Sequence, residues 1–243
     1  FVSHAVLITS LVSLVLFQQH RQKENTIFFM VASGFLCMGI LDGFLAISQP
    51  GDAFVFLHSV ASLAGGFFFC LSWLFPHVKS KYGLDFVEAG FYASVPLLAG
   101  ALGNWFSGWM VDAIYKRGHW ELSRIGTAIT GFILAAIGLV ASVYMESAFG
   151  AIAFLSIAIF GADMTLSPSW SLCIDIGRRH SGVVSGTMNM AGNLGSFVTA
   201  LAFPYLRVWS GSDEPFFYVG AVLNVVAVFL WLMIQPKRKL EEF

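Results

Sequence analysis

Long runs of apolar residues alternate with short charged segments along the whole chain. Most runs hold about 20 residues, the number that an α-helix needs to cross roughly 30 Å of hydrocarbon. The runs are continuous, whereas a membrane β-strand would alternate apolar and polar positions. The pattern therefore predicts an all-α, polytopic membrane helical bundle with about eight transmembrane helices. Their predicted ranges are 1–17, 26–48, 54–75, 89–111, 125–144, 148–174, 183–206 and 216–234.

Composition supports a membrane protein and argues against several function classes. Only 11% of the 243 residues are charged, against roughly 25% in a soluble domain. The net charge of −1 gives no basic face for nucleic acid. The three cysteines and six histidines show no metal-ligand spacing, and no nucleophile elbow or phosphate loop is present. We therefore predict no metal, no cofactor and no enzyme activity.

The basic residues of the loops predict the orientation. The loops at 112–124 and 175–182 and the C-terminal tail carry most of the Lys and Arg residues. By the positive-inside rule they face the cytoplasm. We expect an integral membrane protein of the bacterial inner (plasma) membrane, in contact with its lipids. Arg21 and Lys23 fit the opposite orientation, which suggests that the first and later parts of the chain differ in origin. The start at Phe1 favours a fragment or a processed product.

A charged segment follows the predicted helix 89–111. It reads Gly108-Trp-Met-Val-Asp112-Ala-Ile-Tyr-Lys116-Arg117 and resembles the G-x-x-x-D-x-x-x-x-R loop motif of the major facilitator superfamily of secondary transporters. Gly108 permits close helix packing, Asp112 lies at the membrane boundary, and Arg117 adds a mobile cation. Such a cluster can hold one conformation until substrate favours another. We expect these three residues to form a cytoplasmic gate.

A longer match lies between Trp170 and Leu206. The stretch C-I-D-I-G-R-R-H-S-G-V-V-S-G-T-M-N-M-A-G-N-L-G, from 173 to 195, is similar to the tenth and eleventh helices of the anion:cation symporter family within that superfamily. Segments 73–76 and 89–100 resemble its seventh and eighth helices. The resemblance covers about residues 64–240, the C-terminal six-helix half. It implies symport of small organic anions such as sugar acids, or of inorganic phosphate, with a coupling proton or sodium ion.

Residues 1–63 lack the motifs of the family's N-terminal half. Gly39-Ile-Leu-Asp42-Gly43 and Phe56-Leu-His58-Ser resemble, more weakly, the helices of a bacterial multi-helix membrane sensor. We therefore divide the chain into N-terminal membrane helices at 1–63 and a half-domain at 64–243. A membrane sensor or receptor module and an inactive chimeric fragment stay open as alternatives. A homo-oligomer would rebuild the two halves of a transporter.

Three polar side chains share one face of the predicted helix 183–206. Ser185, Asn189 and Asn193 recur at a spacing of four, and an amide offers both a donor and an acceptor to a hydroxylated carboxylate. Packing beside the neighbouring glycines is the alternative. We expect these residues to line a substrate cavity, together with Tyr92 and Trp73 on the helices matched to the eighth and seventh.

Asp163 lies near the middle of the predicted helix 148–174, five residues before Pro168. Ionisable residues inside a membrane face the bundle or a cavity and mark a function by default. Burial disfavours the charged form of a carboxyl group. We therefore expect Asp163 to couple transport to protons. The alternative is a neutral Asp163 bonded to Ser167 or to a carbonyl that Pro168 frees.

Overall fold

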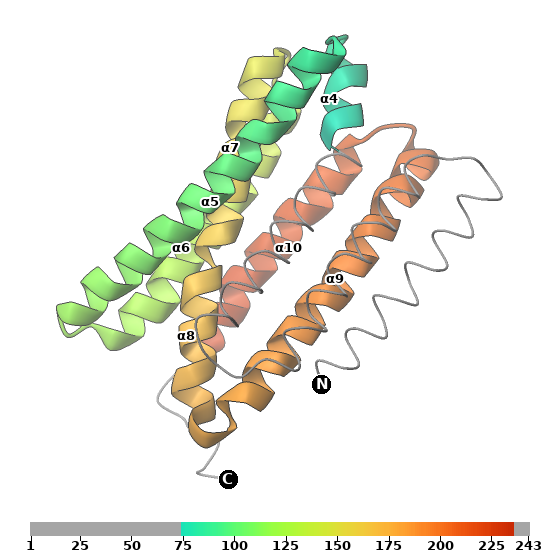
Figure 1. The fold of residues 1–243 in the computed structure, drawn as a ribbon. Helices are drawn as coiled ribbons and strands as arrows, with labels where there is room; N and C mark the ends of the chain where they lie inside the picture. The colour runs from blue at the N-terminus through green and yellow to red at the C-terminus, as the bar shows by residue number, and fades with distance from the viewer. Residues whose placement is uncertain (1–73, 236–243) are drawn as a thin grey trace. The chain divides into compact units, whose positions relative to one another are not determined.

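The computed structural model of the protein describes residues 74–235 (Figure 1). Every regular element in this range is helical, which confirms an all-α fold there. The elements are α4 (Phe75–Tyr82), α5 (Phe86–Lys116), α6 (Trp120–Val143), α7 (Ala148–Met164), α8 (Leu166–Gly177), the 3₁₀ turn η2 (Arg178–His180), α9 (Ser181–Ser210) and α10 (Glu214–Met233). The helices predicted at 1–17 and 26–48, and nearly all of 54–75, lie outside the described residues.

The chain folds into two compact units. The first comprises Phe1–Ala93 and Gly186–Leu201, and the second comprises Ser94–Ser185 and Ala202–Phe243. Within the second unit, α5 runs beside α7, α6 packs along α7, and α10 packs on α6 (Figure 1). The residues discussed below as a candidate site belong mainly to this second unit.

The five spans predicted in the described range all correspond to helices. Four stretches are long and apolar enough to cross a membrane by length and composition. They are Phe86–Lys116, Trp120–Val143, Ala148–Ser196 and Glu214–Met233. The third stretch includes α7, α8 and the beginning of α9, where two of the predicted spans lie. Hydrophobic length alone therefore located these helices.

The predicted connection at 76–88 contains a helix that the sequence analysis missed. Pro76 suits the first turn of α4, and Gly83 ends the helix in the left-handed region at φ 64°. In the first unit, the Phe75 and Phe86 rings meet edge to face at 5.2 Å between centroids. With eight residues, α4 is too short to show a helical period in its sequence.

The predicted helix 148–174 is broken near its middle. α7 ends at Met164, and α8 begins at Leu166. Proline has no N–H, so Pro168 removes the donor that would normally bond the carbonyl four residues earlier, at Met164. Two hydroxyl groups bond other carbonyls beside the break: the Thr165 hydroxyl donates to the Ala162 carbonyl at 2.7 Å, and the Ser169 hydroxyl donates to the Thr165 carbonyl at 2.6 Å. The break comes directly after Asp163.

Short polar side chains cap the starts of two long helices, α5 and α7. The Asp85 carboxylate accepts a bond from the Glu88 N–H at 2.7 Å, which caps α5. The Ser147 hydroxyl accepts a bond from the Gly150 N–H at 3.1 Å, which caps α7. At the tight turn between α5 and α6, Gly118 has φ 85°, a conformation that favours glycine.

Glycines bring α6 and α7 into backbone contact. A Cβ atom at Gly138 would lie 2.6 Å from the Ala158 nitrogen, and one at Gly161 would lie 2.6 Å from the Ala135 nitrogen. Both distances are shorter than real Cβ contacts, so no larger residue fits without displacing the helices. In lipid the hydrophobic effect does not drive helices together. Small residues favour helix association there because they permit dense van der Waals packing.

Candidate functional site

Asp163 packs directly on the backbone of α5. A Cβ atom at Gly100 would overlap the Asp163 carboxylate and would lie 2.9 Å from Ile159 Cγ2. Gly100 is the fifteenth of the 31 residues of α5, and at 1.5 Å per residue it lies about 22 Å from the start of that helix. The structure therefore places Asp163, next to the end of α7, against the middle of α5.

One turn further along the same contact, a hydrogen bond joins α5 to α8. The Ser167 hydroxyl lies 3.2 Å from Asn104 Oδ1 and 3.5 Å from the Asn104 carbonyl oxygen. A Cβ atom at Gly108 would lie 3.6 Å from Ser167 Oγ. Gly100, Asn104 and Gly108 recur at a spacing of four, so they form one stripe of α5 that faces Asp163 and Ser167. We call this contact the α5–α8 seam.

The predicted gate residues divide between this seam and the exposed end of α5. Gly108 lies on the seam, and Asp112 follows it at the same spacing of four. The Asp112 and Arg117 side chains are exposed, and neither forms an ion pair with any residue in the range 74–235. The gate formed by Gly108, Asp112 and Arg117 stays a prediction.

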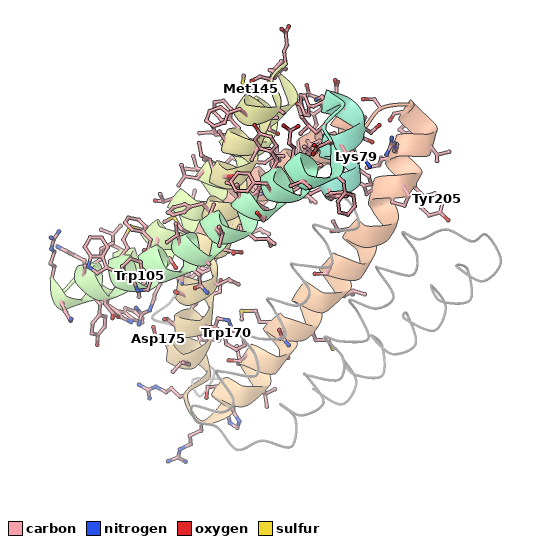
Figure 2. The ribbon with its side chains drawn as sticks, turned by 45° about the horizontal axis from the view of Figure 1, so that its top comes forward. Lys79, Trp105, Met145, Trp170, Asp175 and Tyr205 are labelled. Atoms are coloured by element: carbon pink, nitrogen blue, oxygen red, sulfur yellow. The ribbon has the colours of Figure 1, made fainter. Side chains whose placement is uncertain are left out.

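A buried ion pair lies close to this end of α5 instead. Arg124 of α6 is 9% exposed, and its Nε donates to Asp175 Oδ2 of α8 at 2.9 Å. The Trp120 Nε1 donates to the same oxygen at 3.0 Å, and the Tyr115 ring lies 5.4 Å from the guanidinium carbon. Figure 2 labels Asp175 on α8, close to Trp170 of the same helix. These contacts connect the α5–α6 turn to α8.

Sequence reasoning missed this pair. In the sequence, Arg124 is one of the basic residues of the loop at 112–124, and Asp175 belongs to the stretch 173–195 that resembles the symporter family. The two residues are separated by 51 positions, so no spacing rule joins them. The sequence does contain one signal for this ion pair: Asp175 lies near the end of one apolar run, and Arg124 lies at the start of another.

Three of the five predicted cavity residues, Ser185, Asn189 and Tyr92, have side chains that the structure describes. Ser185 of the second unit forms a hydrogen bond with the buried Cys173 thiol. Asn189 is half-buried in α9, and Tyr92 is half-buried in α5 with its ring 6.3 Å from that of Phe91; both belong to the first unit. The Asn193 side chain and all of Trp73 lie outside the described residues. The substrate cavity stays a prediction.

The comparison with known families decides the membership of this chain. The family model of the Major Facilitator Superfamily matches residues 1–200. The chain belongs to the major facilitator superfamily. This membership confirms the resemblance found in the sequence and accounts for the polytopic helical membrane fold. The matched range includes residues 1–63, and the division of the chain at residue 63 stays a prediction.

Relatives of this chain in the superfamily are transporters of small anions. A probable sulfoacetate transporter of Cupriavidus necator is 32% identical over 168 residues, which are 68% of this chain and 39% of the relative. A probable galactarate/D-glucarate transporter of Escherichia coli K12 is 28% identical over 170 residues, 69% of this chain and 37% of the relative. A D-galactonate transporter of E. coli O6:H1 is 26% identical over 179 residues, 73% and 41% respectively. The chain spans about two fifths of the length of these relatives.

Proposed function

We propose that the protein is a secondary active transporter of small organic anions such as sugar acids and related carboxylates. The named substrates of three relatives support this class, because sulfoacetate, galactarate or glucarate, and galactonate are all small organic anions. A coupling cation would drive their accumulation. We further propose that the protein lies in a bacterial inner membrane, and that a homo-oligomer would supply the second wall of the cavity.

The observation that carries the coupling proposal is the position of Asp163. A carboxylate at mid-span is costly to keep charged in hydrocarbon. Before Lys116, α5 contains no Lys or Arg, and α7 and α8 contain none. Among the described residues, no hydrogen bond or ion pair compensates Asp163. A bound cation would therefore stabilise the conformation in which Asp163 lies against Gly100, and its release would favour another conformation.

We propose that the end of the second unit at which two basic loops meet faces the cytoplasm. The Arg124–Asp175 ion pair holds the α5–α6 turn near the end of α8. The basic residues beside these segments are Lys116, Arg117, Arg178 and Arg179. Positive charge gathers on the cytoplasmic side of membrane proteins, so we place this end in the cytoplasm. The predicted gate of Gly108, Asp112 and Arg117 would then close the cytoplasmic side.

The proposed substrate contacts come from Asn193, Asn189 and Ser185, with Tyr92 and Trp73. Asn193→Ala should lower anion uptake at least tenfold at equal membrane abundance. The reason is that a site built to hydrogen-bond a polar group of its substrate loses much of its affinity when that hydrogen bond is removed. Asn224→Ala is a matched control, because the Asn224 amide donates to the Gly220 carbonyl of its own helix at 2.8 Å. Equal uptake by the two variants would remove Asn193 from the cavity.

The test of the coupling role separates accumulation from exchange. The purified chain is reconstituted into proteoliposomes, and labelled galactarate is offered with or without an inward cation gradient. Asp163→Asn carries a permanently neutral amide, so we expect it to lose gradient-driven accumulation and to retain exchange of internal for external substrate. Glu146→Gln, which neutralises an exposed residue between α6 and α7, is the control. Full accumulation by Asp163→Asn would refute the coupling role.

A further inference from the structure

Asp163 packs against apolar groups, and two oxygen-bearing side chains lie one helical turn away. Ile159 and the Gly100 backbone flank the carboxylate. One helical turn along the seam, Ser167 Oγ lies 3.2 Å from Asn104 Oδ1. Carboxylate, amide and hydroxyl oxygens are the ligands that hard cations prefer. The α5–α8 seam therefore offers a cation three side chains of the preferred kind.

The spacing of two of these oxygens fits neighbouring ligands of one ion. Cations of the size of Na⁺ or Ca²⁺ bind oxygen at about 2.4 Å. Two ligands at right angles around such an ion are then roughly 3.4 Å apart, close to the 3.2 Å between Ser167 Oγ and Asn104 Oδ1. A proton requires only the Asp163 carboxylate and leaves Asn104 and Ser167 without a role in coupling.

Charge selects a monovalent ion. Asp163 is the only acidic residue of α7, and the nearest acidic residues on α5 and α8 are Asp112, eight residues from Asn104, and Asp175, eight residues from Ser167. Residues 74–235 also hold no group of three His, Cys, Asp or Glu side chains suited to a metal ion. A single negative charge is neutralised by one Na⁺, whereas a divalent cation would leave a net positive charge in hydrocarbon.

The helix break supplies a further reason to place an ion here. α7 ends at Met164, directly after Asp163, and Pro168 removes the usual donor for the Met164 carbonyl. Transporters commonly bind coupling ions near the bilayer midplane at such discontinuous helices. Asn104 is exposed on α5, and an exposed amide at mid-span requires polar surroundings and not lipid. An ion can therefore reach the seam from a polar space.

We propose that Asp163, Asn104 and Ser167 form a sodium-ion site on the α5–α8 seam. This inference rests on the proposed cation coupling and names its ion and its ligands. Asp163 would supply the neutralising charge, and Asn104 and Ser167 would supply the oxygens that distinguish Na⁺ from a proton.

Binding is measured on the full purified chain without any transport step. Thermal protection is recorded in NaCl and, at equal ionic strength, in choline chloride. We expect Na⁺ to protect the wild type, Asp163→Asn to abolish the protection, and Asn104→Ala and Ser167→Ala to raise the half-saturating Na⁺ concentration by roughly tenfold or more. Ser167→Thr keeps the hydroxyl and should respond as the wild type does.

Ser156→Ala is the matched control for the loss of a hydroxyl. The Ser156 hydroxyl donates to the Ile152 carbonyl of α7 at 2.7 Å, so its removal should leave the Na⁺ response unchanged. The site is refuted if wild-type protection in NaCl equals that in choline chloride, or if Ser167→Ala and Ser156→Ala respond alike. Uptake driven by a proton gradient in sodium-free buffer would overturn the sodium site and leave the proposed transport function intact. Thermal protection by Na⁺ without uptake of any anion would support the sodium site and overturn the proposed transport function.

Discussion

The Arg124–Asp175 ion pair gives a prediction whose size can be worked out from the structure. Both side chains are largely buried, with 11% and 22% of their surfaces exposed. At the observed Nε–Oδ2 distance of 2.9 Å, and at an effective dielectric constant near 20, the attraction is on the order of 5 kcal/mol before desolvation is subtracted. Removing one partner of a buried pair typically costs about 3–5 kcal/mol, because the other charge stays buried and unpaired.

The remaining contacts reduce this cost. Asp175→Asn keeps an oxygen that can still accept the Trp120 N–H, and Arg124 would retain its contacts with Ser123 and Tyr115. We therefore expect Asp175→Asn and Arg124→Gln each to lower the free energy of unfolding by about 2–3 kcal/mol. The double variant should lose about as much as either single one, which gives a coupling energy of roughly 2–3 kcal/mol.

The assay is reversible unfolding of the purified chain by SDS in mixed micelles, followed by far-UV circular dichroism. The Arg207–Asp213 pair, at an Nε–Oδ1 distance of 3.1 Å, is the control, because its arginine side chain is 49% exposed although its aspartate is 17% exposed. Asp213→Asn should cost less than about 1 kcal/mol, because the guanidinium that it leaves unpaired, that of Arg207, is half-exposed to water. If the losses from Asp175→Asn and Arg124→Gln simply add in the double variant, the reasoning about a coupled buried pair is refuted.

Three further predictions follow from the helices and their loops. Gly138→Ala should destabilise the chain by about 1–3 kcal/mol in the same SDS assay, because its Cβ would lie 2.6 Å from the Ala158 nitrogen. Gly182 has open space around it, so Gly182→Ala should leave the stability unchanged. Equal losses of stability in the two variants would contradict the close packing of α6 on α7. Ser147→Ala removes the cap of α7 and should cost about 1 kcal/mol, whereas an unchanged midpoint would show that the cap is dispensable. A cysteine placed at Lys116 should be labelled only from the cytoplasmic side by an impermeant maleimide, and periplasmic labelling would reverse the orientation.

Hydrophobic length predicted the long helices well, because crossing a membrane imposes a minimum apolar run. Local exceptions were harder to predict. The break before Leu166 depends on one proline whose ring and missing N–H disturb a single turn, and helices tolerate some prolines: Pro96 lies inside the uninterrupted α5. The helix α4 has too few residues for a period to emerge.

The candidate site shows the limit of reading a single sequence. Asp163 stood out because an acidic residue in an apolar run is costly. Its contact with Gly100 depends on how α5 and α7 pack. Gly100 and Asp163 are 63 positions apart in the sequence, and so are Asn104 and Ser167. The regular spacing of Gly100, Asn104 and Gly108 marks a face, but only the structure shows what that face touches.

The most direct test of the central claim is uptake of labelled galactarate and sulfoacetate into proteoliposomes that contain the purified chain. Inward sodium and proton gradients are applied separately, and protein-free liposomes give the background. The account predicts accumulation of at least one of these anions above its external concentration, driven by a cation gradient and abolished when the gradient is collapsed. Folded protein that accumulates neither anion under either gradient would contradict the claim that this chain carries out cation-coupled transport of organic anions.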